Sequence, residues 1–304
     1  MQFTQILAAL CSAAIAVGST VASAEPLPAV SAPNAKLSFE GGRLDDTNGG
    51  VALGSYTIPL APAVGFQIDG ALGRMGDEVL GGVGAHLFTR NPERYLLGVF
   101  SSYHTWNSID IWRLAAESEL YIDRVSISGL AGYEGLRTPN TIDGLEVIQP
   151  DKSRFFTHID LAYYLTDDLK VFAGYRFEDD VSFAGAGAEY MLRTAGAPIS
   201  LFARGNFGQS EHASVTGGVK IHLGSDPGKT LIQRHRMDDP QIYVPVFPKL
   251  ATKAQSTPGG PTICSVDIDD IVTSPSSGTC VCPSGSFREG QPPVGSGPYY
   301  CGAA

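Results

Sequence analysis

The sequence predicts an all-β fold, an antiparallel transmembrane β-barrel of about 12 strands with a short disulfide-bonded C-terminal tail. Three observations predict it. Apolar side chains recur at every second position through most of the chain, and this period belongs to strands because successive side chains leave a strand on opposite faces. The runs are about 11 residues long, which at ~3.3 Å per residue and a tilt of ~45° cover about 25 Å, the height of a membrane barrel's apolar band. Aromatic residues such as Trp106 and Trp112 lie near the ends of the runs, as in interfacial girdles.

The expected strands are separated by turn-forming residues, for example at 90–93, 107–108 and 166–168. In chain order the strands are 35–43, 50–58, 63–73, 79–89, 95–106, 109–122, 124–134, 154–165, 169–178, 181–192, 199–208 and 213–223. If they form a meander with both ends on the periplasmic side, the longest connection, 135–152, falls on the outside. Long loops are typical of the outer side of such barrels.

Charged residues fall on the parity opposite the apolar one, so in a closed barrel they face the lumen. These candidate lumen-lining residues are Asp69, Arg113, Glu117, Glu119, His158, Asp160, Lys170, Arg176, Glu178, Arg204, Lys220 and His222. Two interpretations stay open. A basic strip facing an acidic one selects and orients permeating solutes. Alternatively, the same groups pair and close the barrel, because about 12 strands leave only a moderately wide interior.

Both ends of the chain differ from the barrel region. An apolar core at 6–18 and the small-residue site at 22–24 predict a signal peptide, residues 1–24, cleaved after Ala24. The barrel then covers 25–224, and 225–262 reads as a linker with a solvated helix in its basic stretch. Residues 263–304 form the tail, which we expect on the periplasmic side.

The tail contains all four cysteines of the mature chain, namely Cys264, Cys280, Cys282 and Cys301. An even number in an exported chain predicts two disulfides, with three possible pairings. A zinc site is the alternative, but the tail has no histidine and its cysteine spacing is irregular.

Composition and motifs argue against several other functions. The net charge of −10 gives no electrostatic footprint for nucleic acid. A His212-x-Ser214 pair would share one strand face, as a nucleophile and its base require, but apart from the adjacent Glu211 the sequence places no acid to orient the histidine. We therefore expect no enzyme, no cofactor and no metal.

The alternating region, about 35–224, closes on Gly217-Gly-Val-Lys-Ile-His-Leu-Gly224 and resembles the porin-like outer-membrane β-barrels of Gram-negative bacteria. The resemblance implies a place in the outer membrane among lipid and lipopolysaccharide, and passive diffusion of small polar solutes. Its alternative implication is a non-conducting barrel that acts as a structural or surface-interaction scaffold through the 135–152 loop. The chain departs from the family in one respect, because it ends in Cys301-Gly-Ala-Ala rather than on an aromatic residue.

Overall fold

The structure is a computed structural model of the whole chain. It describes residues 27–44, 47–142, 145–147, 152–178, 181–193, 197–208, 213–224, 226–247, 252–254, 262–263, 280–281, 286–289 and 300–303. The expected signal peptide and its cleavage site lie outside the described residues.

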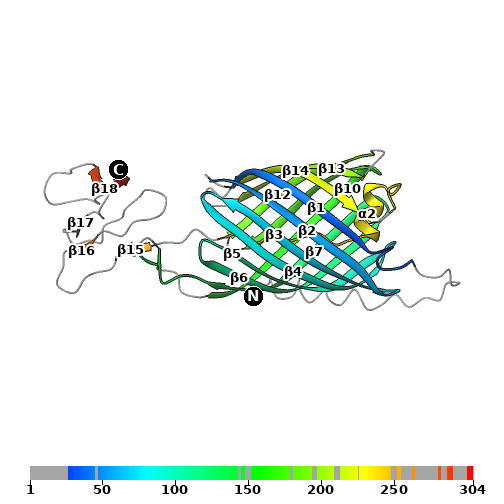
Figure 1. Cartoon of the computed structure of the whole chain (residues 1–304), viewed down its shortest axis with the longest axis horizontal. Helices are drawn as coiled ribbons and strands as arrows, with labels where there is room; N and C mark the ends of the chain where they lie inside the picture. The colour runs from blue at the N-terminus through cyan, green and yellow to red at the C-terminus, as the bar shows by residue number, and fades with distance from the viewer. Residues whose placement is uncertain are drawn as a thin grey trace, which may run out of the picture.

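Twelve strands close into one antiparallel barrel (Figure 1). They are β1 (Asn34–Leu44), β2 (Thr47–Ala61), β3 (Val64–Met75), β4 (Glu78–Asn91), β5 (Tyr95–Trp106), β6 (Ile109–Ile122), β7 (Val125–Arg137), β10 (Lys152–Thr166), β11 (Leu169–Glu178), β12 (Val181–Leu192), β13 (Ile199–Gly208) and β14 (Ala213–Leu223). Each barrel strand pairs with the next along the chain, and β14 pairs with β1 to close the ring. The predicted all-β barrel and its twelve strands are confirmed, with every strand end within three residues of the expected position.

The barrel has an apolar outside and a polar inside. In β6, for example, buried and exposed residues alternate along almost the whole strand. Every barrel strand contributes exposed apolar or aromatic side chains, among them Leu37, Tyr56, Ile68, Val83, Val99, Leu114, Tyr133, Ile159, Tyr175, Tyr190, Leu201 and Val215. A continuous apolar surface of this extent suits contact with lipid, and a closed barrel satisfies the backbone hydrogen bonds that lipid cannot.

A charge on this face should destabilise the barrel by an amount that depends on depth. Ile159 lies at the middle of β10 and Leu165 at its end, with similar exposed fractions of 49% and 53%. We expect Ile159→Arg to lower the free energy of unfolding in lipid vesicles by about 2–4 kcal/mol, and Leu165→Arg by about 0–1 kcal/mol. Urea titrations in phosphatidylcholine vesicles measure both; equal losses would argue against a bilayer around this strand.

The two ends of the barrel differ. At the short-turn end, β1 begins, β14 ends, and tight turns at 62–63, 123–124 and 167–168 join neighbouring strands. At the long-connection end, residues between β7 and β10 include the short strands β8 (Thr141–Ile142) and β9 (Leu145–Val147). The long connection therefore lies at the end of the barrel opposite the start of β1 and the end of β14, as the sequence predicts.

After β14 the chain turns back into the barrel. Helix α2 (Leu231–Met237) lies at the short-turn end (Figure 1). Its first turn is closed by a capping box, in which the Thr230 hydroxyl accepts from the Gln233 amide and the Gln233 side chain accepts from the Thr230 amide. None of the helices among the described residues combines the length and apolarity that crossing a membrane requires.

The expectation of a solvated linker is wrong for this part of the chain. The helix itself forms as expected, but Leu231 is fully buried against Tyr164 and Met191 of the barrel. Residues 238–247, here called the luminal segment, then continue as extended chain and are largely buried at Asp238, Asp239 and Tyr243.

Beyond the luminal segment the chain is described only at five short strands. β15 (Thr252–Ala254) pairs antiparallel with β9, β16 (Thr262–Ile263) pairs with β17 (Cys280–Val281), and β18 (Ser286–Glu289) pairs with β19 (Tyr300–Ala303). Cys264 and Cys282 lie outside the described residues, and only the backbone of Cys280 and Cys301 is described. The two disulfides stay a prediction.

Candidate functional site in the barrel lumen

Helix α2 is fixed in the mouth of the short-turn end by backbone and side-chain contacts. The Leu231 amide donates to Asp168 Oδ1 at 3.2 Å, and the Ile232 amide donates to the Asp167 carbonyl at 3.1 Å. On the far side of the helix, Arg236 Nη2 donates to the Val125 carbonyl at 3.0 Å. These acceptors lie at the start of β7 and in the β10–β11 turn, and because β7 pairs with β10 the helix is held against one side of the opening.

His235 turns from the helix toward the lumen. Burial, with Lys170 nearby, lowers the pKa of His235 to about 3, so its imidazole is neutral at pH 7. A neutral ring can accept at Nδ1, and the Tyr164 hydroxyl lies 2.8 Å from that atom. The Nε2 atom faces Glu189 Oε2 at 3.5 Å.

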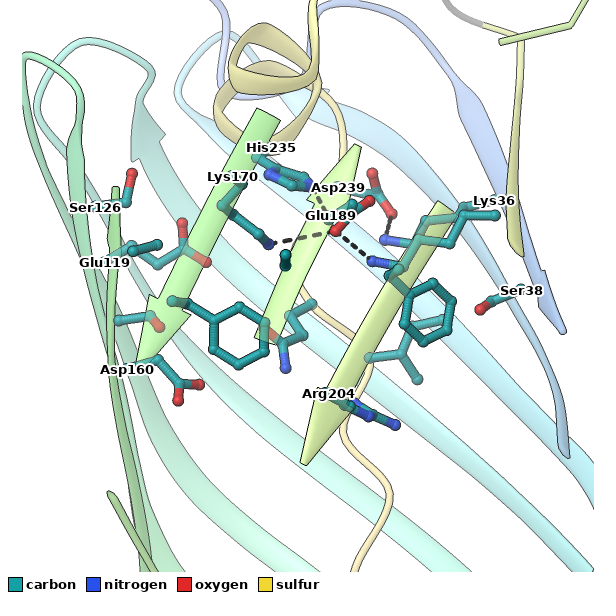
Figure 2. A pocket seen from close by; sticks show the side chains of 18 of the residues that line it. Lys36, Ser38, Glu119, Ser126, Asp160, Lys170, Glu189, Arg204, His235 and Asp239 are labelled. Carbon is teal, nitrogen blue, oxygen red and sulfur yellow. Dashed lines mark hydrogen bonds and ion pairs between the residues drawn. The ribbon is translucent and has the colours of Figure 1, made fainter. Parts of the chain in front are cut away.

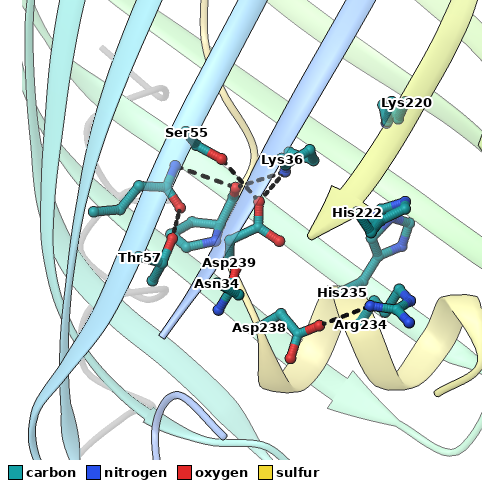
Figure 3. Close-up of polar contacts among 12 residues, drawn as sticks. Asn34, Lys36, Ser55, Thr57, Lys220, His222, Arg234, His235, Asp238 and Asp239 are labelled. Atoms are coloured by element: carbon teal, nitrogen blue, oxygen red, sulfur yellow. Dashed lines mark hydrogen bonds and ion pairs between the residues drawn. The ribbon is translucent and has the colours of Figure 1, made fainter. Parts of the chain in front are cut away.

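The luminal segment starts with two aspartates that hold it to the barrel. Asp238 accepts from the Ser31 hydroxyl at 2.8 Å and pairs with Lys229, both at the short-turn end. Asp239 forms a buried ion pair with Lys36 of β1 and accepts from Ser55 of β2 at 3.3 Å (Figure 3). Asp239 thus fixes the luminal segment to β1 through an ion pair and to β2 through a hydrogen bond.

In the middle of the barrel the segment is held by aromatic packing. The Tyr243 ring lies 5.4 Å from Phe100, 5.7 Å from His158 and 6.2 Å from His86, measured between ring centroids. These partners come from β5, β10 and β4, and their side chains all point inward. A ring that touches strands from different parts of the wall must stand inside the lumen.

Further along, a network of buried charges receives the segment. The Val246 amide donates to Glu178 Oε2 at 3.0 Å. Glu178 also pairs with Arg113 and His158, and Arg113 donates to Glu134 at 2.8 Å. Arg154 joins through Glu134 at 2.6 Å. We call Arg113, Glu134, Arg154, His158 and Glu178 the lumen network.

The segment leaves through an apolar ring at the long-connection end. Phe247 packs against Leu80, Ile109, Ile111 and Leu136, and its ring lies 5.6 Å from that of Trp106. The residues of the luminal segment thus contact the barrel wall near both ends and at positions between them.

All twelve predicted lumen residues face inward, but they pair locally instead of forming two opposed strips. Asp69 and Glu117 flank His86 at 2.9 and 2.8 Å, and Arg113, His158 and Glu178 meet in the lumen network. The remaining contacts are Arg176 to Asn206 (2.7 Å) and Asp160 (3.5 Å), Arg204 to Glu40 (2.6 Å), Lys220 and Lys170 to Glu189 (2.7 and 3.4 Å), Tyr121 to Glu119 (2.7 Å) and Ser200 to His222 (2.9 Å). Local pairing is the arrangement expected of a closed barrel.

A cavity with a volume of about 130 Å³ lies beside the luminal segment. Charged residues of β1, β10, β11, β12, β13 and β14 surround it, as Figure 2 shows for Lys36, Asp160, Lys170, Glu189 and Arg204. His235 and Asp239 close it on the side of the C-terminal segment. A volume of this size holds several water molecules, since one needs roughly 10–15 Å³.

Some important residues were not among those expected from the sequence. Lys36, Glu40, Glu134 and Glu189 lie on the inward parity of strands that the sequence predicts, so the alternation contains the signal for them. Asp239 and Tyr243 follow the last strand and show no period of two, so no local signal marks them. Of the His-x-Ser pair, His212 lies outside the described residues, and Ser214 Oγ accepts from Asn206 at 3.0 Å.

No protein-family model matches the chain, and no curated protein matches it. Several solved structures do. A KdgM porin aligns over 63% of this chain and 99% of its own at 8% identity (TM-score 0.45), and a NanC porin over 62% and 100% at 6% identity (TM-score 0.45). The outer-membrane protein Omp33 of Acinetobacter baumannii aligns over 63% and 98% at 13% identity (TM-score 0.41). These likenesses concern the barrel fold alone.

Proposed function

We propose that this chain is an outer-membrane β-barrel that its own C-terminal segment keeps closed, and that it acts as a non-conducting scaffold. The observation that supports this is the buried path of the luminal segment from one end of the lumen to the other. Asp239, Tyr243 and Val246 contact inward side chains of β1, β2, β4, β5, β10 and β11. The outer apolar face then meets membrane lipid and lipopolysaccharide.

Charge pairing gives the closed state a physical reason. Taking the lumen charges out of water is costly unless each finds a partner of opposite sign. The side chains of Arg113, Glu134 and Glu178 are at most 1% exposed, and each has at least one ionic partner, as this cost requires. A lumen built for flow keeps such groups hydrated, whereas here they bond to each other and to the segment.

Passive diffusion of small polar solutes is the second candidate. The polar cavity of about 130 Å³ favours it, because Lys170, Lys220 and Arg204 line that space together with Glu189 and Asp160. Solutes would use this route only if the luminal segment moved aside.

Conductance of the purified full-length protein in planar bilayers separates the two candidates. We expect no steady current from a sample that migrates as a folded, heat-modifiable barrel, because the lumen is filled. A general porin measured in the same bilayer is the positive control. Stable open channels from the folded full-length chain would overturn the closed scaffold and support diffusion.

A further inference from the structure

We infer that the barrel carries its own C-terminal tail through the membrane, so that the chain following Thr252–Ala254 is displayed on the side of the long connection. This inference rests on the same luminal segment as the proposed function, but it concerns the destination of the tail and not the flow of solutes. It replaces the expectation, drawn from the sequence, of a periplasmic tail.

The contacts advance along the barrel in the order of the chain. Asp239 pairs with Lys36, the third residue of β1, close to the short-turn end. Val246 bonds to Glu178, the last residue of β11, and β11 ends at the long-connection end. Phe247 then contacts Trp106 and Ile109, which flank the tip of the β5–β6 hairpin at that same end. The chain has crossed the barrel within these residues.

The length of the luminal segment agrees with a single crossing. From Asp239 to Phe247 the chain advances eight residues. Extended chain covers about 3.3 Å per residue, so this stretch reaches about 26 Å. The apolar band of a membrane barrel is about 25 Å tall.

Beyond the exit, the tail joins the long connection. Thr252–Ala254 pairs antiparallel with Leu145–Val147, and with Thr141–Ile142 these strands form a three-stranded sheet. Figure 1 shows β15 beyond one end of the barrel and α2 at the other. If the long connection faces the outside, as long loops of outer-membrane barrels do, the tail is a displayed polypeptide. The barrel would then anchor and present this tail to partners outside the cell.

The test compares three positions in intact cells. An epitope tag is placed after Ala304, and single cysteines are introduced separately as Asn140→Cys in the long connection and Asp123→Cys in a turn at the short-turn end. We expect an antibody to detect the tag on intact cells as fully as after permeabilisation, and external protease to remove it. Asn140→Cys should react with a membrane-impermeant maleimide, and Asp123→Cys should react only after permeabilisation, with the parent chain correcting for its own cysteines.

The outcomes are distinct. A tag that behaves like Asn140→Cys supports the inference, whereas a tag that behaves like Asp123→Cys overturns it. Heat-modifiable migration of each tagged or substituted chain shows that the barrel has folded. Steady current through the full-length protein, with the tag still on the side of Asn140, would overturn the closed scaffold and leave this inference standing.

Discussion

Ending the chain after Gly224 should turn a silent barrel into an open channel. This truncation removes α2 and the luminal segment, which together run through the lumen from the short-turn end to the ring around Phe247. The twelve-strand ladder needs neither of them, because β14 already pairs with β1 to complete the barrel. Water entering the lumen can replace the hydrogen bonds that Lys36, Gln67 and Glu178 lose.

The matched control for this truncation ends the chain after Phe247. It keeps α2 and the luminal segment and removes only the chain beyond them, residues 248–304, so we expect it to be as silent as the full-length protein. Single-channel recording in planar bilayers measures both, with heat-modifiable migration as the test of folding. If the chain ending at Gly224 folds and stays silent, the barrel wall itself is closed and the luminal segment is not what blocks the pore.

Replacing Arg113 by methionine should cause the largest loss of stability from a single change in the lumen. Arg113 is 1% exposed and bridges Glu134 and Glu178, and its guanidinium lies 4.4 Å from the ring centre of Phe156. Its removal takes away the cation that the buried Glu134 and Glu178 carboxylates share. Each carboxylate then keeps one partner at the edge of the network, Arg154 for Glu134 and His158 for Glu178. Breaking a buried ion pair by removing one partner costs about 3–5 kcal/mol.

The control for this substitution is Arg124→Met. Arg124 also pairs with a carboxylate, Asp167, at 2.8 Å, but the two side chains are 39% and 56% exposed. Exposed pairs contribute about 0–1 kcal/mol, because water screens them. Urea unfolding in lipid vesicles should therefore separate the two variants by several kcal/mol. Equal, small losses would mean that the lumen network is hydrated, which would weaken the argument for a dry, closed interior.

The wall of the barrel could be predicted because its signal is local. In β10 and β11, outward residues such as Ile159 and Tyr175 alternate with inward ones such as His158 and Arg176, and this parity is set by strand geometry within a few residues. Six of the expected strands, including 109–122 and 213–223, have the observed bounds for this reason. The inward direction of the candidate lumen residues follows from the same alternation.

The pairing of those residues could not be predicted, because partners lie on strands far apart in the sequence. Arg113 and Glu178 are separated by 65 positions, and Arg204 and Glu40 by 164. Parity gives the face on which a charge lies, but the barrel's register and closure decide which opposite charge it meets. The choice between an open charged lumen and a closed paired one therefore depended on the tertiary structure.

By itself, the sequence determined that this chain forms a twelve-strand barrel with an apolar outside, because a period of two is written into each strand. Only the tertiary structure decided the path of the chain after Gly224. Asp239 and Tyr243 carry no periodic pattern, and their partners, Lys36 and His158, come from strands that are distant in sequence. The luminal segment is buried by contacts with the inside of the barrel, and these contacts exist only after the barrel has closed. Its burial is therefore not encoded in a local sequence pattern.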